Sequence, residues 1–337
     1  METAVVGANV IMYERFYGLR ERPFDLTPNP KYLCLSARHS EALSNLRYGI
    51  TGRRGVTVLI GEAGTGKTTL VRAALASKEL ATSQCIYLNN PALTRAEFIE
   101  FLARAFGLSD RAASSKTALL FELERLLVDR CAQGVVSALV VDEAQALPVE
   151  LLEEVRLLAN IETATEKLLP VVLAGQPQLA AKLNDPELKQ LKQRVALRCE
   201  LQPLDLAETT AYISGRIRIA GGDARKVFTR DAVDLIHQCS KGIPRTISVI
   251  CDNALLSGFA GDERPIGWET IYEVCGDFDL APQGRQPRSR QPAAAPAVGL
   301  PRPERTIEPA KAATVMTGAG GDSLFSSFTR RRGFSFF

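Results

Sequence analysis

GEAGTGKT, the stretch from Gly61 to Thr68, decides how this sequence is interpreted, because it fits the pattern G-x-x-x-x-G-K-[ST]. The apolar run VTVLI (residues 56–60) precedes it, and TTLVRAALAS (residues 68–77) follows with helical periodicity. A strand, a glycine-rich turn and a helix in this order form a loop whose backbone N–H groups cradle phosphate oxygens. The alternative is a glycine-rich strand–helix turn that carries a lysine by chance.

This loop predicts that the chain binds a nucleoside triphosphate together with a metal ion. Lys67 is expected to reach the β- and γ-phosphates, and the hydroxyl of Thr68 is expected to ligate Mg²⁺. ATP and Mg²⁺ are therefore the expected cofactors. The residues expected to bind the nucleotide are Gly61, Glu62, Ala63, Gly64, Thr65, Gly66, Lys67, Thr68 and Thr69.

Two acids, Asp142 and Glu143, directly follow the apolar run ALVV (residues 138–141). Because burying carboxylates costs free energy, acids at the end of a buried strand need an explanation. In P-loop ATPases the first such acid holds Mg²⁺ through water and the second polarises the attacking water, and this pair fits these two roles. The alternative is a strand end that emerges into solvent with ordinary acidic residues. No N-K-x-D motif follows a strand, so a GTPase is not indicated.

Short apolar runs alternate with longer amphipathic stretches between residues 56 and 202. Each run has the length of a strand and is nearly apolar throughout, as expected of a parallel strand buried on both faces. Strands that alternate with helices predict a doubly wound α/β sheet. The expected strands are residues 56–60, 85–88, 138–141, 169–174 and 196–201, and the expected helices are residues 37–51, 67–77, 95–106, 115–133 and 149–161.

After Pro203 the pattern changes to helices only. Asp205 and Glu208 form a capping box that opens a helix, and Pro244 is placed at the first turn of another. From Ala281 the composition shifts to Pro, Ala, Arg and Gly, which buries too little apolar surface to fold. The expected organisation is a disordered leader (1–12), an α/β nucleotide-binding domain with an N-terminal segment (13–203), a helical lid (204–280) and a disordered tail (281–337).

Composition indicates a soluble globular protein with 46% hydrophobic and 23% charged residues. The net charge of +3 is uneven: residues 281–337 carry +6 and the rest −3, so net charge does not favour a nucleic-acid binder. The seven cysteines are scattered, without a C-x-x-C pair, which is typical of a reduced cytosolic protein. No apolar stretch reaches the roughly 20 residues that span a bilayer, and the N-terminus lacks the features of a signal peptide.

Further motifs accompany the loop and the acids: FYGLRERPFDLTPNPKYLCLSARHSEAL (residues 16–43), LAGQPQL (173–179), LKQRVALRCEL (191–201) and GIPRTI (242–247). With them, residues 13–275 resemble the AAA+ ATPases of the general secretion pathway protein A type. The resemblance implies a P-loop AAA+ fold, with a five-stranded parallel sheet of order 5-1-4-3-2 and a C-terminal α-helical lid. Members of that family are linked to secretion, pilus or polysaccharide-export machinery at the bacterial envelope, and relatives act in DNA transposition.

The resemblance also implies roles for residues outside the loop and the acids. Gln176 matches the polar sensor of the γ-phosphate, and Arg245 matches the lid arginine that contacts the nucleotide. Arg194 or Arg198 lies where such proteins place a finger arginine that reaches a neighbouring subunit's ATP, and Arg194 is favoured. The alternatives are a loop-capping Gln176, a solvated Arg245, and a surface basic cluster that includes both candidate finger arginines.

Two other groups of residues leave both interpretations open. Asn89 and Asn90 end the second strand, where many AAA+ proteins carry a residue that restrains the catalytic glutamate, but an Asn-Asn-Pro turn explains them equally well. Tyr17, Pro23 and Phe24 either line the adenine pocket or anchor the N-terminal segment in a core.

These observations predict an ATP hydrolase that serves an envelope assembly, secretion or polysaccharide-export system, as a homo-oligomer with ATP at subunit interfaces. Its expected location is cytoplasmic, or peripheral at the inner membrane through an unidentified protein partner. One alternative is a DNA-binding transposition or replication ATPase, and another is a nucleotide-dependent scaffold with negligible turnover. The tail motif FTRRRGF (residues 328–334) is either a peptide that docks in a partner's groove, a binder of an anionic membrane surface or of a nucleic acid, or a solvated end.

Overall fold

A computed structural model describes residues 13–27, 30–32, 36–89 and 92–281 of the 337-residue chain. The predicted leader and nearly all of the predicted tail lie outside these residues, as do Asn90 and Cys34. The elements, contacts and absences of the fold and the site are those of the described residues.

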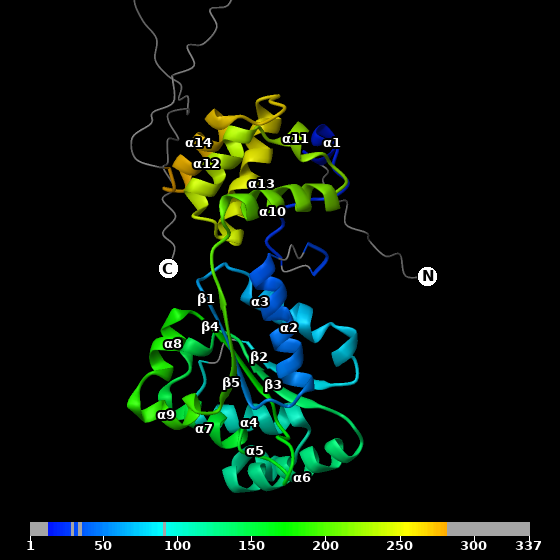
Figure 1. The fold of residues 1–337 in the computed structure, drawn as a ribbon, viewed down its shortest axis with the longest axis vertical. Helices are drawn as coiled ribbons and strands as arrows, with labels where there is room; N and C mark the ends of the chain where they lie inside the picture. Colours follow the sequence, from blue (N-terminus) through cyan, green and yellow to red (C-terminus); the bar gives the residue numbers. More distant parts are fainter. Residues whose placement is uncertain (1–12, 28–29, 33–35, 90–91, 282–337) are drawn as a thin grey trace, which may run out of the picture. The chain divides into compact units, whose positions relative to one another are not determined.

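Five parallel strands form one sheet in the order β2-β3-β4-β1-β5 (Figure 1). Read from the other edge, this is the expected order 5-1-4-3-2, so the predicted fold is confirmed. Because all strands point the same way, the loops after β1, β3 and β4 meet at one edge of the sheet. The strands are β1 (Val56–Gly61), β2 (Gln84–Leu88), β3 (Ser137–Val141), β4 (Val171–Gly175) and β5 (Val195–Leu201).

Helices cover both faces of the sheet. Leu59, Val140 and Val172 point into a core beneath α2 (Ala37–Thr51) and α3 (Lys67–Leu75). The alternate strand residues point into a larger core on the other face. The elements on that second face are α4 (Arg95–Phe106), α5 (Asp110–Ser114), α6 (Lys116–Ala132), η3 (Ala144–Ala146), α7 (Val149–Leu158), α8 (Pro177–Leu183), η4 (Pro186–Leu188) and α9 (Lys189–Lys192).

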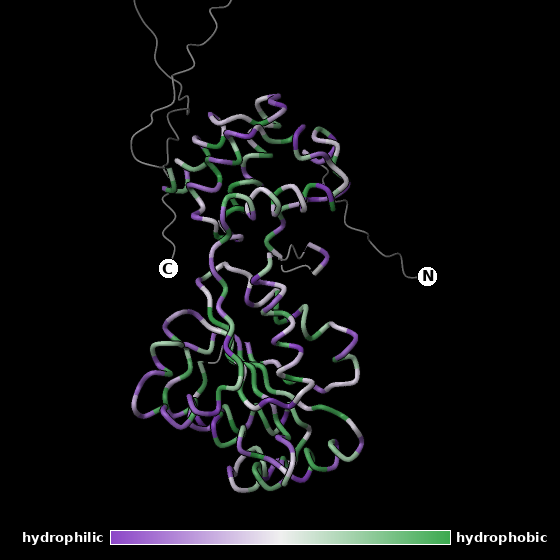
Figure 2. The backbone as a smooth tube through the Cα atoms, viewed as in Figure 1, coloured by the Kyte–Doolittle hydropathy of each residue, from purple (hydrophilic) through white to green (hydrophobic). Residues whose placement is uncertain are grey.

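The strand sequences are apolar because both faces are covered. Every residue of β1, β3 and β4 is buried. Figure 2 shows that hydrophobic residues gather on the central strands. The edge strand β5 pairs only with β1 and alternates between more and less exposed residues. Two of the expected helices, at residues 37–51 and 95–106, have the predicted bounds.

The chain after β5 is helical. The capping box of Asp205 and Glu208 opens α10, because each side chain accepts a hydrogen bond from the backbone of the other residue. Pro244 occupies the first turn of α13, as expected. The helices are α10 (Leu206–Ile219), α11 (Ala224–Val227), α12 (Arg230–Ser240), α13 (Pro244–Ala260) and α14 (Trp268–Asp277), and they share one hydrophobic core.

The N-terminal segment contributes to this helical core. Tyr13, Tyr17 and Phe24 are each at most 1% exposed and lie among residues of the helices after β5. Burying an aromatic side chain stabilises a fold by about 1.5–3 kcal/mol, so these contacts hold the segment firmly. The segment and the connections also contain α1 (Glu14–Tyr17), η1 (Pro30–Tyr32) and η2 (Lys78–Leu80).

Within the described residues, no helix combines the length and the apolar character needed to cross a bilayer. The six cysteines in this part of the chain are free, and four of them are buried. The four buried cysteines lie within hydrophobic cores, in agreement with the interpretation of small core side chains, whereas Cys131 contacts Arg53 and Glu166.

Candidate active site

The phosphate loop joins the end of β1 to the start of α3. Gly64 and Gly66 have φ angles of +83° and +96°, values that only glycine adopts readily. A β-carbon on Gly64 would lie 2.9 Å from the Cβ of Arg245, so glycine also allows α13 to approach the loop. The turn and its packing therefore both depend on the glycines of the motif.

Hydrogen bonds within the loop stabilise its conformation. The Thr65 hydroxyl donates to the carbonyl of Glu62 at 2.8 Å. Lys67 donates from Nζ to the carbonyls of Gly61 at 2.9 Å and Glu62 at 3.0 Å. Lys67 is only 4% exposed, and this burial lowers its pKa, although Glu143, Asp142 and Glu62 act in the opposite direction. A buried ammonium group held by carbonyls alone is suited to receive an anion.

Asp142 lies beside the start of α3, at the end of β3. Its Oδ2 accepts hydrogen bonds from the hydroxyl of Thr68 at 2.6 Å and the hydroxyl of Tyr87 at 2.7 Å. Its Oδ1 accepts from the backbone N–H of Glu143 at 2.9 Å. The structure thus brings together the two residues expected at the metal, Thr68 and Asp142. Both present oxygen atoms, which Mg²⁺ prefers, so the donor set fits that ion.

Tyr87 was not identified from the sequence. It is a polar aromatic residue in β2, next to β3 in the sheet. Burial and the contact with Asp142 raise the pKa of Tyr87, so the hydroxyl stays protonated and donates to the carboxylate. The only signal in the sequence is a tyrosine within the otherwise apolar run CIYL.

Glu143 is held from two sides. Its Oε2 accepts hydrogen bonds from Nε2 of Gln145 at 2.6 Å and from Nε2 of Gln176 at 3.3 Å. The structure therefore places Gln176, at the end of β4, beside the second acid. Gln145 was not identified as a site residue, although it lies only two residues after Glu143.

His39 contacts the phosphate loop from the first turns of α2. Its Nε2 lies 3.1 Å from the carbonyl oxygen of Thr65, and its Nδ1 lies 2.8 Å from the hydroxyl of Ser36. A carbonyl only accepts, so Nε2 carries a proton and donates. His39 is 6% exposed and supports the loop from outside. Nothing in the sequence pattern marked this histidine.

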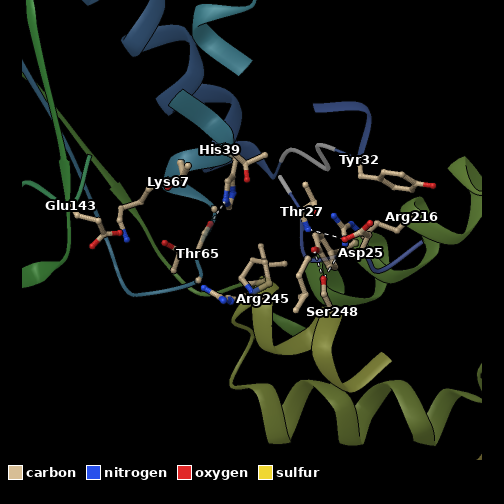
Figure 3. A pocket seen from close by; sticks show the side chains of 18 residues that line it. Asp25, Thr27, Tyr32, His39, Thr65, Lys67, Glu143, Arg216, Arg245 and Ser248 are labelled. Carbon is tan, nitrogen blue, oxygen red and sulfur yellow. Dashed lines mark hydrogen bonds between the residues drawn. The ribbon is translucent and has the colours of Figure 1, made fainter. Parts of the chain in front are cut away.

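A cavity of about 390 Å³ extends from the loop to the helical core (Figure 3). Lys67 and Glu143 lie at one end of it, and Asp25, Tyr32 and Arg216 lie toward the other. Lys67 at one end suits an anionic group, and the aromatic ring of Tyr32 at the other suits a planar group. The volume and this arrangement of side chains therefore suit a ligand that has both.

Arg245 lines the middle of the cavity. Its backbone N–H donates to the carbonyl of Gly64 at 3.2 Å. The backbone of the expected lid arginine is therefore in direct contact with the phosphate loop.

Arg216 is a buried charged side chain at the far end of the cavity, where Asp25 is exposed. It is 8% exposed, donates to the Ser248 hydroxyl at 3.0 Å and lies over the rings of Tyr32 and Tyr212 at 5.3 and 5.1 Å. Its Nε is buried and makes no hydrogen bond in this structure. A sequence pattern gives no means of distinguishing this arginine from its exposed neighbour Arg218.

Several predicted residues lie away from the cavity. The carbonyl of Arg194 accepts from the backbone of Val56, at the start of β1, so Arg194 lies at the opposite end of that strand from the phosphate loop, roughly 16 Å along it. Arg198 is exposed on the edge strand β5. Asn89 is exposed.

Tyr17, Pro23 and Phe24 are buried but do not line the cavity. Of the two interpretations left open for the aromatic residues, the structure supports the core contact.

Comparison with known proteins supports the fold and the resemblance. A family model described as an AAA domain matches residues 50–183. General secretion pathway protein A of Aeromonas hydrophila is 44% identical over 273 residues, covering 80% of this chain and 48% of that protein. The chain therefore spans about half the length of this curated relative.

Two solved structures share the fold at low sequence identity. The Aeropyrum pernix ORC2 protein, solved as ADPNP–ADP complexes, has a TM-score of 0.58 at 18% identity, covering 76% of this chain and 71% of that one. CDC6P from Pyrobaculum aerophilum has a TM-score of 0.57 at 17% identity, covering 77% and 70%. The chain thus has an AAA+ P-loop fold, carries an AAA domain and resembles General secretion pathway protein A.

Proposed function

We propose that this chain, with its AAA domain and its resemblance to General secretion pathway protein A, binds ATP with Mg²⁺ and hydrolyses it to ADP and phosphate. One observation carries the proposal: the Thr68 hydroxyl lies 2.6 Å from the Asp142 carboxylate, with Glu143 as the next residue. Thr68 and Asp142 are 74 positions apart in the chain, and their contact puts both beside the phosphate loop, where a triphosphate with its metal ion would bind.

The phosphate loop would bind the triphosphate. Gly61 to Thr69 present backbone N–H groups and the N-terminus of α3, and Lys67 supplies a positive charge. Lys67 would exchange its bonds to the carbonyls of Gly61 and Glu62 for phosphate oxygens. The burial of Lys67 strengthens its attraction to an anion.

Thr68 and Asp142 would hold Mg²⁺, Asp142 through water. The ion, when bound, supplies positive charge that neutralises the β- and γ-phosphate oxygens. Within the protein, the hydroxyl of Tyr87 and the N–H of Glu143 fix the orientation of the Asp142 carboxylate.

Glu143 would activate the water. Its carboxylate accepts a proton while the water oxygen bonds to the γ-phosphorus. The bond from that phosphorus to the β,γ-bridging oxygen breaks, and its electron pair remains on ADP. Gln176, which contacts Glu143 at 3.3 Å, would orient the water or the γ-phosphate.

We propose residues 204–280 as a lid, whose Arg245 contacts the phosphates from α13. The contact between Arg245 and Gly64 supports this role. The base and ribose would occupy the far end of the cavity, near Tyr32, Tyr212 and Arg216.

Arg194 is proposed as a finger that completes the site of a neighbouring subunit, with Arg198 as the alternative. Its distance from the phosphate loop of its own chain supports a role in trans, because an arginine at the far end of β1 does not reach that loop. An arginine in trans would stabilise charge on the transferred phosphoryl group. The proposed assembly is a homo-oligomer with ATP at its interfaces.

The proposed setting is a bacterial envelope assembly, secretion or export system, in the cytoplasm or peripheral at the inner membrane through a partner. It rests on the 44% identity to General secretion pathway protein A. A Glu143→Gln variant loaded with ATP should retain such a partner in a pull-down read by mass spectrometry. ATP-dependent retardation of DNA in a gel, without such a partner, would instead favour the transposition or replication alternative.

Phosphate release with and without Mg²⁺ tests the chemistry directly. Wild type should hydrolyse ATP only with the metal, and Lys67→Ala should lose nucleotide binding. Glu143→Gln should bind ATP normally but turn over roughly 10²–10⁴ times more slowly. Lys189→Ala and Glu200→Gln, which change exposed residues of the same types, serve as matched controls. Undiminished turnover by Glu143→Gln would remove this acid from the mechanism.

A further inference from the structure

We propose that Gln145 is a positioning residue for Glu143, which fixes the carboxylate of that acid against the end of β4. The inference rests on the proposed function, because it takes Glu143 as the acid that activates water. It assigns a role in hydrolysis to a residue that contacts neither ATP nor metal in that scheme.

Both ends of the Gln145 amide are used. Nε2 donates to Oε2 of Glu143 at 2.6 Å, and Oε1 accepts from the backbone N–H of Gln176 at 3.0 Å. Turning the amide around would set its oxygen against a carboxylate and its NH₂ against an N–H, so both bonds would be lost. The amide therefore has one orientation, and that orientation points a donor at Glu143.

The surroundings of Gln145 leave little room for another arrangement. A β-carbon on Gly175 would lie 2.8 Å from Oε1 of Gln145, so the glycine before Gln176 makes space for this amide. Lys182 on α8 donates to the carbonyls of Gln145 at 2.5 Å and Leu147 at 2.9 Å. The short helix η3 is thus tied to both β4 and α8.

Glu143 needs such external support because of its own backbone. Its φ of +52° is in the left-handed region, which costs a non-glycine residue free energy and persists only where neighbours impose it. Glu143 is also only partly buried, so packing alone does not hold its side chain. Of its two amide contacts, the one from Gln145 is the shorter, at 2.6 Å against 3.3 Å from Gln176.

The two glutamines can therefore divide their tasks. If Gln176 turns toward a bound γ-phosphate, its weaker contact to Glu143 is lost. Gln145 then still holds the Glu143 carboxylate. Because Gln145 also accepts from the backbone N–H of Gln176, the carboxylate keeps its position relative to the end of β4. Moving a catalytic group by about 1 Å from its working position lowers the rate roughly 100-fold.

The test measures kcat, KM and equilibrium ATP affinity for Gln145→Leu. We expect kcat to fall roughly 10- to 100-fold, with ATP affinity within about twofold of wild type. Gln202→Leu is a matched control, because Gln202 also donates to a glutamate two residues earlier, Glu200, at 2.7 Å on the exposed end of β5. This control should retain wild-type kinetics.

A double variant separates positioning from a general structural role. In a Glu143→Gln background, Gln145→Leu should cause no further loss, because its effect passes through the missing carboxylate. An equal loss in both backgrounds would overturn the proposal. Faster turnover by Gln145→Leu alone would also overturn it, since it would mean that the amide restrains Glu143.

A further variant keeps the test decisive. If Gln145→Leu unfolds, Gln145→Glu retains the acceptor for the Gln176 N–H but places a second carboxylate against Glu143, so it should fold and lose kcat at least as strongly. The proposed function fails if wild type and Glu143→Gln hydrolyse ATP equally. The inference alone fails if Glu143→Gln is impaired while both Gln145 variants match wild type.

Discussion

The hydroxyl of Tyr87 donates to the same carboxylate oxygen of Asp142 that accepts a hydrogen bond from Thr68, at 2.7 and 2.6 Å respectively. Asp142 is only 1% exposed. A buried carboxylate needs donors, and here one donor comes from the neighbouring strand and one from the phosphate loop. The tyrosine thereby orients the acid proposed to hold Mg²⁺.

Tyr87→Phe should weaken the affinity of the site for Mg²⁺ during ATP hydrolysis. Without the hydroxyl, the Asp142 carboxylate is free to rotate, so we expect the Mg²⁺ concentration for half-maximal hydrolysis to rise roughly 10-fold. Binding of ATP without metal should stay near the wild-type value. Tyr48→Phe is the control, because Tyr48 is 48% exposed. An unchanged Mg²⁺ requirement would show that Tyr87 only stabilises the fold.

Lys67 should make the stability of the nucleotide-free protein depend on pH. Burial lowers its pKa below the ordinary value of 10.5, so the folded protein loses this proton at lower pH than the unfolded chain does. Between those two values the unfolded chain binds more protons, and the free energy of unfolding rises with pH on account of this group.

Lys67→Met removes that contribution. The difference in free energy of unfolding between wild type and Lys67→Met should therefore move in favour of wild type as the pH approaches 10.5. Urea unfolding across this range measures it, and comparing the two proteins cancels the titration of their shared tyrosines. A difference that does not vary with pH would contradict the prediction.

Arg216 should contribute to binding of the base and ribose but not of the phosphates. Arg216→Lys keeps the charge but loses the planar group that lies between Tyr32 and Tyr212. We expect ATP to bind about 10-fold more weakly, equivalent to about 1.4 kcal/mol, while tripolyphosphate binds as before. Arg218→Lys, an exposed change on the same helix, is the control. Equal weakening for both ligands would place Arg216 at the phosphates.

Arg194→Ala should leave ATP binding intact and reduce hydrolysis by about 10³-fold or more. Because the arginine is proposed to act on a neighbouring subunit, mixing Arg194→Ala with Glu143→Gln should restore part of the activity. The mixed oligomers contain interfaces with one intact acid and one intact finger. Arg198→Ala tests the alternative in the same assay. Activity of the mixture no higher than that of its components would argue against a finger at Arg194.

The features predicted from the sequence are those encoded by neighbouring residues. The phosphate loop is contiguous, and its glycines, lysine and threonine lie at the strand-to-helix junction that their spacing predicts. All five expected strands form, with ends that differ by at most two residues, because periodicity reflects which faces are buried; the short helices α5, α8, α9 and α11 were not predicted. The helix expected at residues 149–161 ends at Leu158, because the amphipathic pattern continues beyond the last hydrogen-bonded turn.

The functional contacts that the sequence analysis missed are between residues far apart in the chain or without a motif of their own. Tyr87 contacts Asp142 across adjacent strands, His39 of α2 contacts Thr65 of the phosphate loop, and Arg216 of α10 lies over the ring of Tyr32 in the N-terminal segment. Local pattern says nothing about such pairs, because a hydrogen bond between distant residues depends on how strands are ordered and how helices pack.

By itself, the sequence determined the class of fold, the phosphate loop and the acidic pair, because each is a local arrangement of residue types with one well-known chemistry. Only the tertiary structure decided which side chains surround those acids, and that Tyr17 and Phe24 belong to a core and not to the cavity. The physical reason is that burial and hydrogen bonding between distant segments arise only when the whole chain has folded, and the same tyrosine or glutamine is core, surface or site according to where that folding places it.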